Sequence, residues 1–215
     1  MKTHGTTMPM DSGFDYDSLQ RLDFLNIDAE RFFRDTGQFD ICYFHKYPFN
    51  VLCNFSPADF WFEGVHIASM EGLIQSLKCP DAEVQREICL TIADEAKEMG
   101  RCYELDGTFD GRTLHWQGRR FGRTSEEYKV FLQSAYEARW QGDPEFRDVL
   151  QATNGYKLTH KIGKKDRSET VLTEDEFIEH LDILRDRHND KSRILTIPQI
   201  IQKLPGSSQT APVRR

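Results

Sequence analysis

The sequence contains 215 residues, which is long enough for one domain with a sizeable hydrophobic core. Hydrophobic residues make up 38% of the chain and aromatic residues 12%, which excludes a chain that is disordered throughout. The net charge of −7 argues against broad, sequence-independent binding to nucleic acids, because such binding depends on neutralising phosphates. Two short basic segments, 119–123 and 161–165, remain candidates for local basic patches.

Residues 1–38 are predicted to form a tail and a helical extension. Residues 1–16 have the composition of a mobile tail, and the apolar residues of 17–35 have helical spacing, with Asp17 or Ser18 as the opening cap. These N-terminal residues contain no apolar stretch like that of a secretory signal peptide, and no apolar run in the sequence approaches the length of a transmembrane helix. The sequence therefore predicts a cytoplasmic protein without a membrane partner.

The five cysteines are odd in number, and no two form a CxxC pair. This spacing argues against a structural zinc site and favours free thiols in a reducing compartment. The histidines also lack further ligands at workable spacing, so no metal is assigned. The cysteines are Cys42, Cys53, Cys79, Cys89 and Cys102.

Two segments before residue 69 have β character. The segment DICYFH, residues 40–45, has the composition of a strand. The segment FWFEGVHIA, residues 60–68, alternates on both sides of Glu63-Gly64, which predicts a hairpin with a two-residue turn.

A helix is predicted over residues 69–78, with three distinct faces. Its apolar residues fall within an arc of about 100° that must face the core: Met70, Leu73, Ile74 and Leu77. Its small residues form a face where another backbone or a ligand can come close: Ser69, Gly72 and Ser76.

The third face of this helix is a polar stripe of Glu71, Gln75 and Lys78. Glu71 and Lys78 are two turns apart, about 10 Å along the axis, so they do not pair directly but can converge on one ligand. The stripe is interpreted either as one wall of a cleft or as an ordinary solvated edge. Periodicity alone leaves both interpretations open.

Helices dominate the rest of the chain. The expected helices cover residues 81–100, ending at Gly100, then 124–142, 143–153 and 173–189. Thr124 with Glu127 and Thr173 with Glu176 are spaced as capping boxes, and Asp143 precedes a proline at the first helical position. The intervening stretch, residues 101–123, is predicted to be a long loop, and such loops are often functional.

The fold class predicted from these elements is a mainly α single domain with a small β-hairpin element near its N-terminal side. The domain is expected to span residues 39–189. Residues 190–215 are expected to hold a short C-terminal helix and a disordered tail.

The segment NVLCNFSPADFWFEGVHIASMEGLIQSLK, residues 50–78, resembles the NADAR family, also called YbiA-like. The family pattern is an S-N-F stretch, a hairpin turn and then S/T-x-E-H-x-x-Q-x-x-K. Further blocks follow in the family's order, including AKEMGR at 96–101, a tryptophan at Trp116 and FIEHLDILR at 177–185. The resemblance covers roughly residues 40–187. The matching residues of the first block are Asn54, Phe55, Glu63, Gly64, Ser69, Glu71, Gln75 and Lys78.

The resemblance implies an N-glycosidase that recognises ADP-ribose-like or phosphorylated ribosyl ligands. Described activities of the family remove ADP-ribose from guanine bases or hydrolyse early riboflavin-pathway intermediates. The expected substrate is thus a small molecule or an ADP-ribosylated nucleotide or nucleic acid, with no cofactor and no obligate protein partner. The implied catalytic residues are Glu71, which stabilises positive charge or activates water, and Lys78, which holds an oxygen or attacks a sugar aldehyde.

The remaining implied site residues bind substrate: Asn54, Phe55, Gln75, Trp116, Arg139 and Lys46. Trp116 is expected to be exposed and to stack on a base. Three positions depart from the family, because Gly72 replaces a histidine, Arg139 a lysine and Phe44 a basic residue, with Lys46 nearby. These departures leave a non-catalytic module that senses ADP-ribose or NAD as the alternative, and a protein-interaction subunit as a third possibility.

Overall fold

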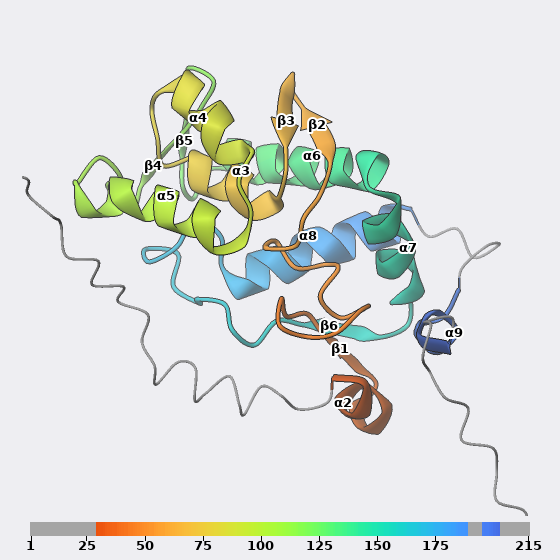
Figure 1. Ribbon diagram of the computed structural model, residues 1–215. Helices are drawn as coiled ribbons and strands as arrows, with labels where there is room; N and C mark the ends of the chain where they lie inside the picture. Colours follow the sequence, from red (N-terminus) through yellow and green to blue (C-terminus); the bar gives the residue numbers. More distant parts are fainter. Residues whose placement is uncertain (1–28, 189–194, 203–215) are drawn as a thin grey trace, which may run out of the picture.

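The computed structural model describes residues 29–188 and 195–202, and Figure 1 shows their arrangement. The predicted opening of the first helix at Asp17 or Ser18 lies outside these residues, as does most of the C-terminal tail. The domain boundaries at 38 and 189 stay predictions. The helices are α2 (Ala29–Thr36), α3 (Met70–Ser76), α4 (Ala82–Cys89), α5 (Ala93–Leu105), α6 (Glu126–Gly142), α7 (Pro144–Ala152), α8 (Glu174–Arg187) and α9 (Ile197–Gln202).

The strands of the described residues form three separate two-stranded pairs. Two of the pairs are antiparallel hairpins, and the pair β1–β6 is parallel and joins segments far apart in the chain. The mainly α fold class with a small hairpin is therefore confirmed, with more strand pairing than predicted. The strands are β1 (Gln38–Asp40), β2 (Phe60–Phe62), β3 (Val65–Ile67), β4 (Thr113–Trp116), β5 (Arg119–Gly122) and β6 (Lys157–Thr159).

The helices α6 and α8 lie along each other through the middle of the molecule (Figure 1). The three helices α3, α4 and α5 form a group at one end, and β1–β6 and α2 lie below α8 in this view. Within the described residues, no helix combines the length and the apolar composition needed to cross a membrane.

The predicted hairpin at residues 60–68 is confirmed. The strands β2 and β3 pair in register around Glu63-Gly64, whose φ angles are 48° and 79°. Two successive positive φ values match the right-handed twist of a hairpin, and glycine adopts such a φ without steric cost. Phe60 and Phe62 point into the core, whereas Trp61 between them is 67% exposed.

The predicted strand at residues 40–45 is wrong beyond its first residue. The strand β1 ends at Asp40, because its parallel partner β6 is only three residues long and ends at Thr159. The chain then turns, with the His45 amide donating to the Cys42 carbonyl and the Phe49 amide to the Lys46 carbonyl. The segment has the composition of a strand, but within the described residues its only strand partner is the short β6.

The predicted single helix over 81–100 is two helices, α4 and α5, with a break after Cys89. The Cys89 carbonyl accepts from the Ala68 amide at 2.8 Å. The Thr91 carbonyl accepts from the Ser69 hydroxyl at 2.9 Å. These bonds from the β3–α3 turn take carbonyls that a continuous helix would use. The helix α5 also runs past Gly100 to Leu105, so the predicted stop is wrong.

The small face of α3 does meet another backbone, as predicted. A Cβ atom on Gly72 would lie 2.8 Å from the carbonyl oxygens of both Ile88 and Thr91. Real Cβ atoms do not approach backbone oxygens so closely, so only glycine fits here without a shift. The histidine that the NADAR family usually carries at this position would find no space in this chain.

Of the three helix caps predicted within the described residues, at Thr124, Asp143 and Thr173, two are confirmed. Asp143 caps α7 ahead of Pro144, and Thr173 forms the capping box of α8 with Glu176. The capping box at Thr124 is wrong by one residue, because the Ser125 hydroxyl accepts from the Tyr128 amide and begins α6.

The predicted long loop at 101–123 is largely ordered structure. Its first residues complete α5, and the rest forms the β4–β5 hairpin, which turns on Gln117-Gly118 with φ angles of 45° and 81°. A positive φ at a glutamine is not apparent from its residue type, whereas Asn-Gly or Asp-Gly would have predicted the turn.

Candidate functional site

The polar stripe of α3 is buried. Glu71, Gln75 and Lys78 are 8%, 8% and 5% exposed, so the interpretation as a solvated edge is wrong. The stripe faces α5, whose Gly100 and Glu104 contact it. Lys78 follows the end of the helix, where a side chain is often exposed, but here Glu104 of α5 contacts it and the side chain is buried.

A chain of hydrogen bonds links the stripe. Gln75 Nε2 donates to Glu71 Oε1 at 2.8 Å, and Lys78 Nζ donates to Gln75 Oε1 at 2.5 Å. Lys78 Nζ also donates to Glu104 Oε1 at 2.5 Å. As expected from their spacing, Glu71 and Lys78 do not pair directly, and the Gln75 amide bridges them.

The surface of α5 is shaped to receive Gln75. A Cβ atom on Gly100 would lie 2.0 Å from Gln75 Oε1 and 2.8 Å from Gln75 Cβ. The absence of a side chain at Gly100 therefore makes room for the amide between the two helices. This contact gives a physical reason for the glycine in the segment AKEMGR.

The Glu71 carboxylate is held in an unusual environment for a charge. Burial raises the pKa of Glu71 above its ordinary value, and the hydrogen bond from Gln75 and the nearby cations oppose that rise. Those cations are Lys97 and Lys78. A carboxyl with a raised pKa can hold a proton near neutrality and deliver it to a leaving group.

Only one oxygen of this carboxylate has a partner among the described residues. Oε1 accepts from Gln75, whereas Oε2 makes no hydrogen bond with any described residue. Among the described residues, some side-chain N and O atoms are fully buried and have no hydrogen-bond partner, but Oε2 is not one of them. We conclude that Oε2 is reached from the surface and is the atom available to a ligand.

The loop before the hairpin brings Asn54 and Phe55 to Glu71. The Asn54 carbonyl accepts from the Glu71 amide at 2.9 Å, and Asn54 Oδ1 accepts from the Tyr136 hydroxyl at 2.9 Å. Phe55 is half-buried, and the ammonium of Lys97 lies 5.9 Å from its ring centroid. The structure thus groups Asn54, Phe55, Gln75 and Lys78 around Glu71.

The sequence did not single out Lys97 or Glu104, which both come from α5. Lys97 is exposed and lies close enough to Glu71 to act on its charge. Lys97 lies inside the segment AKEMGR, and its position in that block is the sequence signal that could have identified it as a site residue. Glu104 lies 26 residues from Lys78 in a stretch predicted to be a loop, and no sequence signal pointed to it.

Arg139, a predicted substrate-binding residue, is fully buried in this structure. Its guanidinium donates to the carbonyls of Val51 at 3.0 Å and Cys53 at 3.3 Å, and it pairs with Asp143 at 3.3 Å. Buried charges in proteins are held by such partners. Arg139 therefore fixes the backbone that leads into Asn54 and has no surface from which to reach a ligand.

Trp116 is also fully buried, and its expected exposure for stacking is wrong. The alternation of β4 turns Leu114 and Trp116 inward, where the indole packs against Phe62 and Phe131. Its Nε1 donates to Glu63 Oε2 at 2.6 Å.

Lys46 and the basic segment 119–123 lie outside helix α3. Lys46 is exposed on a turn that follows the end of β1 at Asp40. In the basic segment, Arg119 pairs with Glu63 and Arg123 with Glu176, so the local positive charge is largely neutralised.

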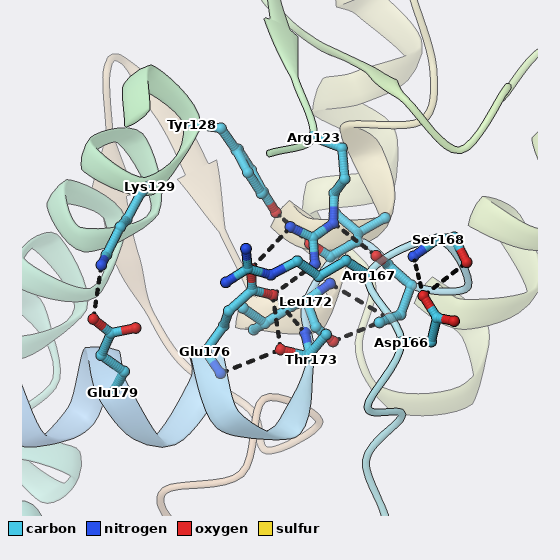
Figure 2. A network of polar contacts seen from close by, with 12 residues as sticks. Arg123, Tyr128, Lys129, Asp166, Arg167, Ser168, Leu172, Thr173, Glu176 and Glu179 are labelled. Atoms are coloured by element: carbon cyan, nitrogen blue, oxygen red, sulfur yellow. Dashed lines mark hydrogen bonds and ion pairs between the residues drawn. The ribbon is translucent and has the colours of Figure 1, made fainter. Parts of the chain in front are cut away.

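A second polar cluster lies where α6 and α8 begin. Figure 2 shows Arg123, Arg167 and Thr173 converging on the Glu176 carboxylate. Arg123 binds both Glu176 oxygens, at 3.1 and 2.6 Å, and Arg167 lies 3.0 Å from one of them. A cavity of about 180 Å³ adjoins the cluster, and Arg123, Arg167 and Glu176 pair with one another at its edge. We assign this cluster a structural role.

Replacing Glu176 with glutamine is expected to destabilise the fold. Burial alone would raise the pKa of Glu176, but the bonds from Arg123 and Thr173 lower it from 4.5 to about 2. A depressed folded pKa contributes stability above the unfolded value, and that contribution is lost as the pH falls from about 4.5 to about 2. The expected loss at pH 7 is on the order of 3 kcal/mol of unfolding free energy, measured by urea denaturation.

A matched control is Glu179→Gln, which breaks the exposed ion pair with Lys129 beside the same cavity. Exposed pairs contribute about 0–1 kcal/mol, so this variant should unfold almost like the parent. Equal losses in the two variants, or an unchanged acid dependence in Glu176→Gln, would contradict the assignment.

No group of three or more His, Cys, Asp or Glu side chains within residues 29–188 and 195–202 is arranged to hold a metal ion.

Comparison with known proteins gives the family of the chain. A profile of the family described as Bacteriophage protein GP30.3 matches residues 46–186. The relative described as "Uncharacterized 17.1 kDa protein in Gp30-rIII intergenic region", from Enterobacteria phage T4, is 35% identical over 142 residues, covering 66% of this chain and 92% of that protein. An NMR structure of the E. coli protein YbiA is similar with a TM-score of 0.49 and 17% identity, covering 70% of this chain and 83% of that chain.

The matched region runs from the turn before Asn54 through α8 and so includes the whole α3 site. It nearly coincides with the region in which the sequence resembles the NADAR family, although the matched profile does not bear that name. With a family profile over most of the domain and a curated relative above 30% identity, the chain belongs to the Bacteriophage protein GP30.3 family.

Proposed function

We propose that this protein is an N-glycosidase that cleaves the bond between a base and ribose. The proposed substrate is an ADP-ribosylated guanine or another phosphoribosyl compound. The proposal rests on the ordered sequence blocks that resemble the NADAR family, together with the surroundings of Glu71.

The observation that carries the proposal is a buried carboxylate with one oxygen fixed by Gln75 and the other open. When a base leaves C1′ of ribose, positive charge develops at the sugar, and a carboxylate in a water-poor site stabilises that charge strongly. The raised pKa of Glu71 also favours a protonated form, which can supply the proton that a departing base needs.

Phe55 and Lys97 provide the remaining contacts that such a substrate requires. An aromatic face suits the base, and an ammonium that forms no ion pair with a described residue suits a phosphate. Asn54 and Gln75 add amide groups that can bind ribose hydroxyls. In this arrangement the substrate lies against the small exposed part of Glu71, close to Phe55 and to Lys97 of helix α5.

A second chemistry uses Lys78 as a nucleophile towards a ring-opened sugar aldehyde. Its ammonium donates to both Gln75 and Glu104 in a buried position, which favours the role of a fixed cation. Borohydride added during turnover is therefore expected to leave Lys78 unmodified by mass spectrometry. A covalent adduct on Lys78 would assign it the attack on the sugar, and one on Lys46 or Lys97 would move the nucleophile elsewhere.

The direct test is to incubate the protein with ADP-ribosylated guanosine or DNA and to measure free ADP-ribose. Release that requires Glu71 supports the N-glycosidase. Saturable binding of ADP-ribose without release supports the non-catalytic module. The tight space at Gly72, which excludes the histidine usual in the NADAR family, is the observation that favours this second candidate. If neither release nor binding of ADP-ribose is observed, the protein-interaction role is the one that remains.

A further inference from the structure

Glu104 stands at the outer end of the hydrogen-bond chain that reaches Glu71. Its carboxylate is 45% exposed, whereas the Lys78 side chain that it binds is 6% exposed. The order along the chain is Glu104, Lys78, Gln75, Glu71. Lys78 donates to both of its neighbours, Glu104 and Gln75, and Gln75 in turn donates to Glu71.

The chemistry of the groups fixes how the Gln75 amide is turned. An ammonium has only hydrogen-bond donors, so the Gln75 atom that faces Lys78 must be the carbonyl oxygen. The opposite side of the amide, its NH₂ group, then faces Glu71. If the ammonium moved away, the amide would lose the partner that sets this orientation.

We infer that Glu104 is a positioning residue: it anchors Lys78 and thereby keeps the NH₂ group of Gln75 directed at Glu71. A buried ammonium without a partner is strongly disfavoured, and Glu104 is the carboxylate that pairs with Lys78 in this place. The catalytic consequence of the inference rests on the proposed function, but the orientation itself does not.

Glu71 is also surrounded by other titratable or charged groups. They come from every element around it: Lys78 just after α3, Asp94 and Lys97 on α5, Cys53 on the loop and Tyr136 on α6. Apart from Lys78, which is a member of the hydrogen-bond chain, none of them is hydrogen-bonded to Glu104 or Gln75, so a change at Glu104 reaches Glu71 either through the chain or through space.

These two routes predict opposite signs for Glu104→Gln. Through space, removing a negative charge would lower the pKa of Glu71 or leave it unchanged. Through the chain, Lys78 loses its anchor, the amide is freed, and the ionised form of Glu71 loses its donor. We therefore expect the pKa of Glu71 to rise by about one unit in the variant.

The experiment is a pH titration of the Glu71 carboxyl carbon by NMR in the full chain without substrate. Glu104→Asp keeps the charge and should restore most of the parent value. Glu98→Gln removes one charge from an exposed pair with Arg101 on the same helix and should have no effect. A lower or unchanged Glu71 pKa in Glu104→Gln would overturn the inference.

A second readout is the side-chain NH₂ signal of Gln75. In the parent its protons should exchange slowly and be held in one orientation, and in Glu104→Gln this protection should be lost. Unchanged protection would count against the inference even if the pKa moves. If the parent turns over substrate, the pH profile of the rate should shift with the Glu71 pKa. If it does not, the proposed function fails, and the two NMR measurements still decide the role of Glu104.

Discussion

Turnover is expected to fall by about 10²- to 10³-fold when Glu71 is replaced by glutamine. The substitution keeps the size of the side chain and an oxygen that can accept from Gln75 Nε2. It removes the negative charge and the transferable proton, which the proposed reaction uses only in the transition state. Binding of ADP-ribose should therefore stay within a few-fold of the parent, as measured by calorimetry beside the rate of ADP-ribose release.

The same variant is expected to be at least as stable as the parent at neutral pH. A carboxyl whose folded pKa is raised opposes folding once the pH is high enough to ionise it, and glutamine removes that cost. Loss of turnover together with an equal or higher Tm is the signature of a residue kept for function. Glu95→Gln, at an exposed position on α5, is the matched control. A Glu71→Gln variant with parental turnover would remove Glu71 from the catalytic role.

Local sequence signals predicted the elements whose causes are local. The Glu63-Gly64 turn, the Asp143 cap and the Thr173 capping box each depend on residues within a few positions of one another. The break between α4 and α5 depends on bonds from Ala68 and Ser69, which lie about 20 residues away in sequence, and no local pattern contains that information.

The candidate site shows the same difference between features with local causes and features with distant causes. The period of a helix placed Glu71, Gln75 and Lys78 on one stripe, and the structure has them on one stripe. Periodicity gives the face of a helix but not the element that covers it, so the burial of the stripe under α5 was not predictable. Glu104 and Lys97 follow only from that covering contact.

Gly100→Ala is expected to disrupt the site without altering any of its polar groups. The new Cβ would lie 2.0 Å from Gln75 Oε1, which can move, but also 2.8 Å from Gln75 Cβ, which cannot move without shifting α3. We expect a loss of about 1–3 kcal/mol of unfolding free energy from this overpacking. Turnover should fall by at least about 10-fold, because a displaced Gln75 no longer holds Glu71 and Lys78.

The sign of the stability change makes this a strict test. In the interior of a helix, alanine is normally favoured over glycine by about 1 kcal/mol, so helix propensity alone predicts a more stable variant. Gly122→Ala is the control, because its Cβ would meet Ser125 at an ordinary 3.6 Å. A Gly100→Ala variant that is both more stable and fully active would mean that Gln75 does not occupy the space over Gly100. The hydrogen-bond chain from Glu71 to Glu104 would then not be the arrangement that the protein uses.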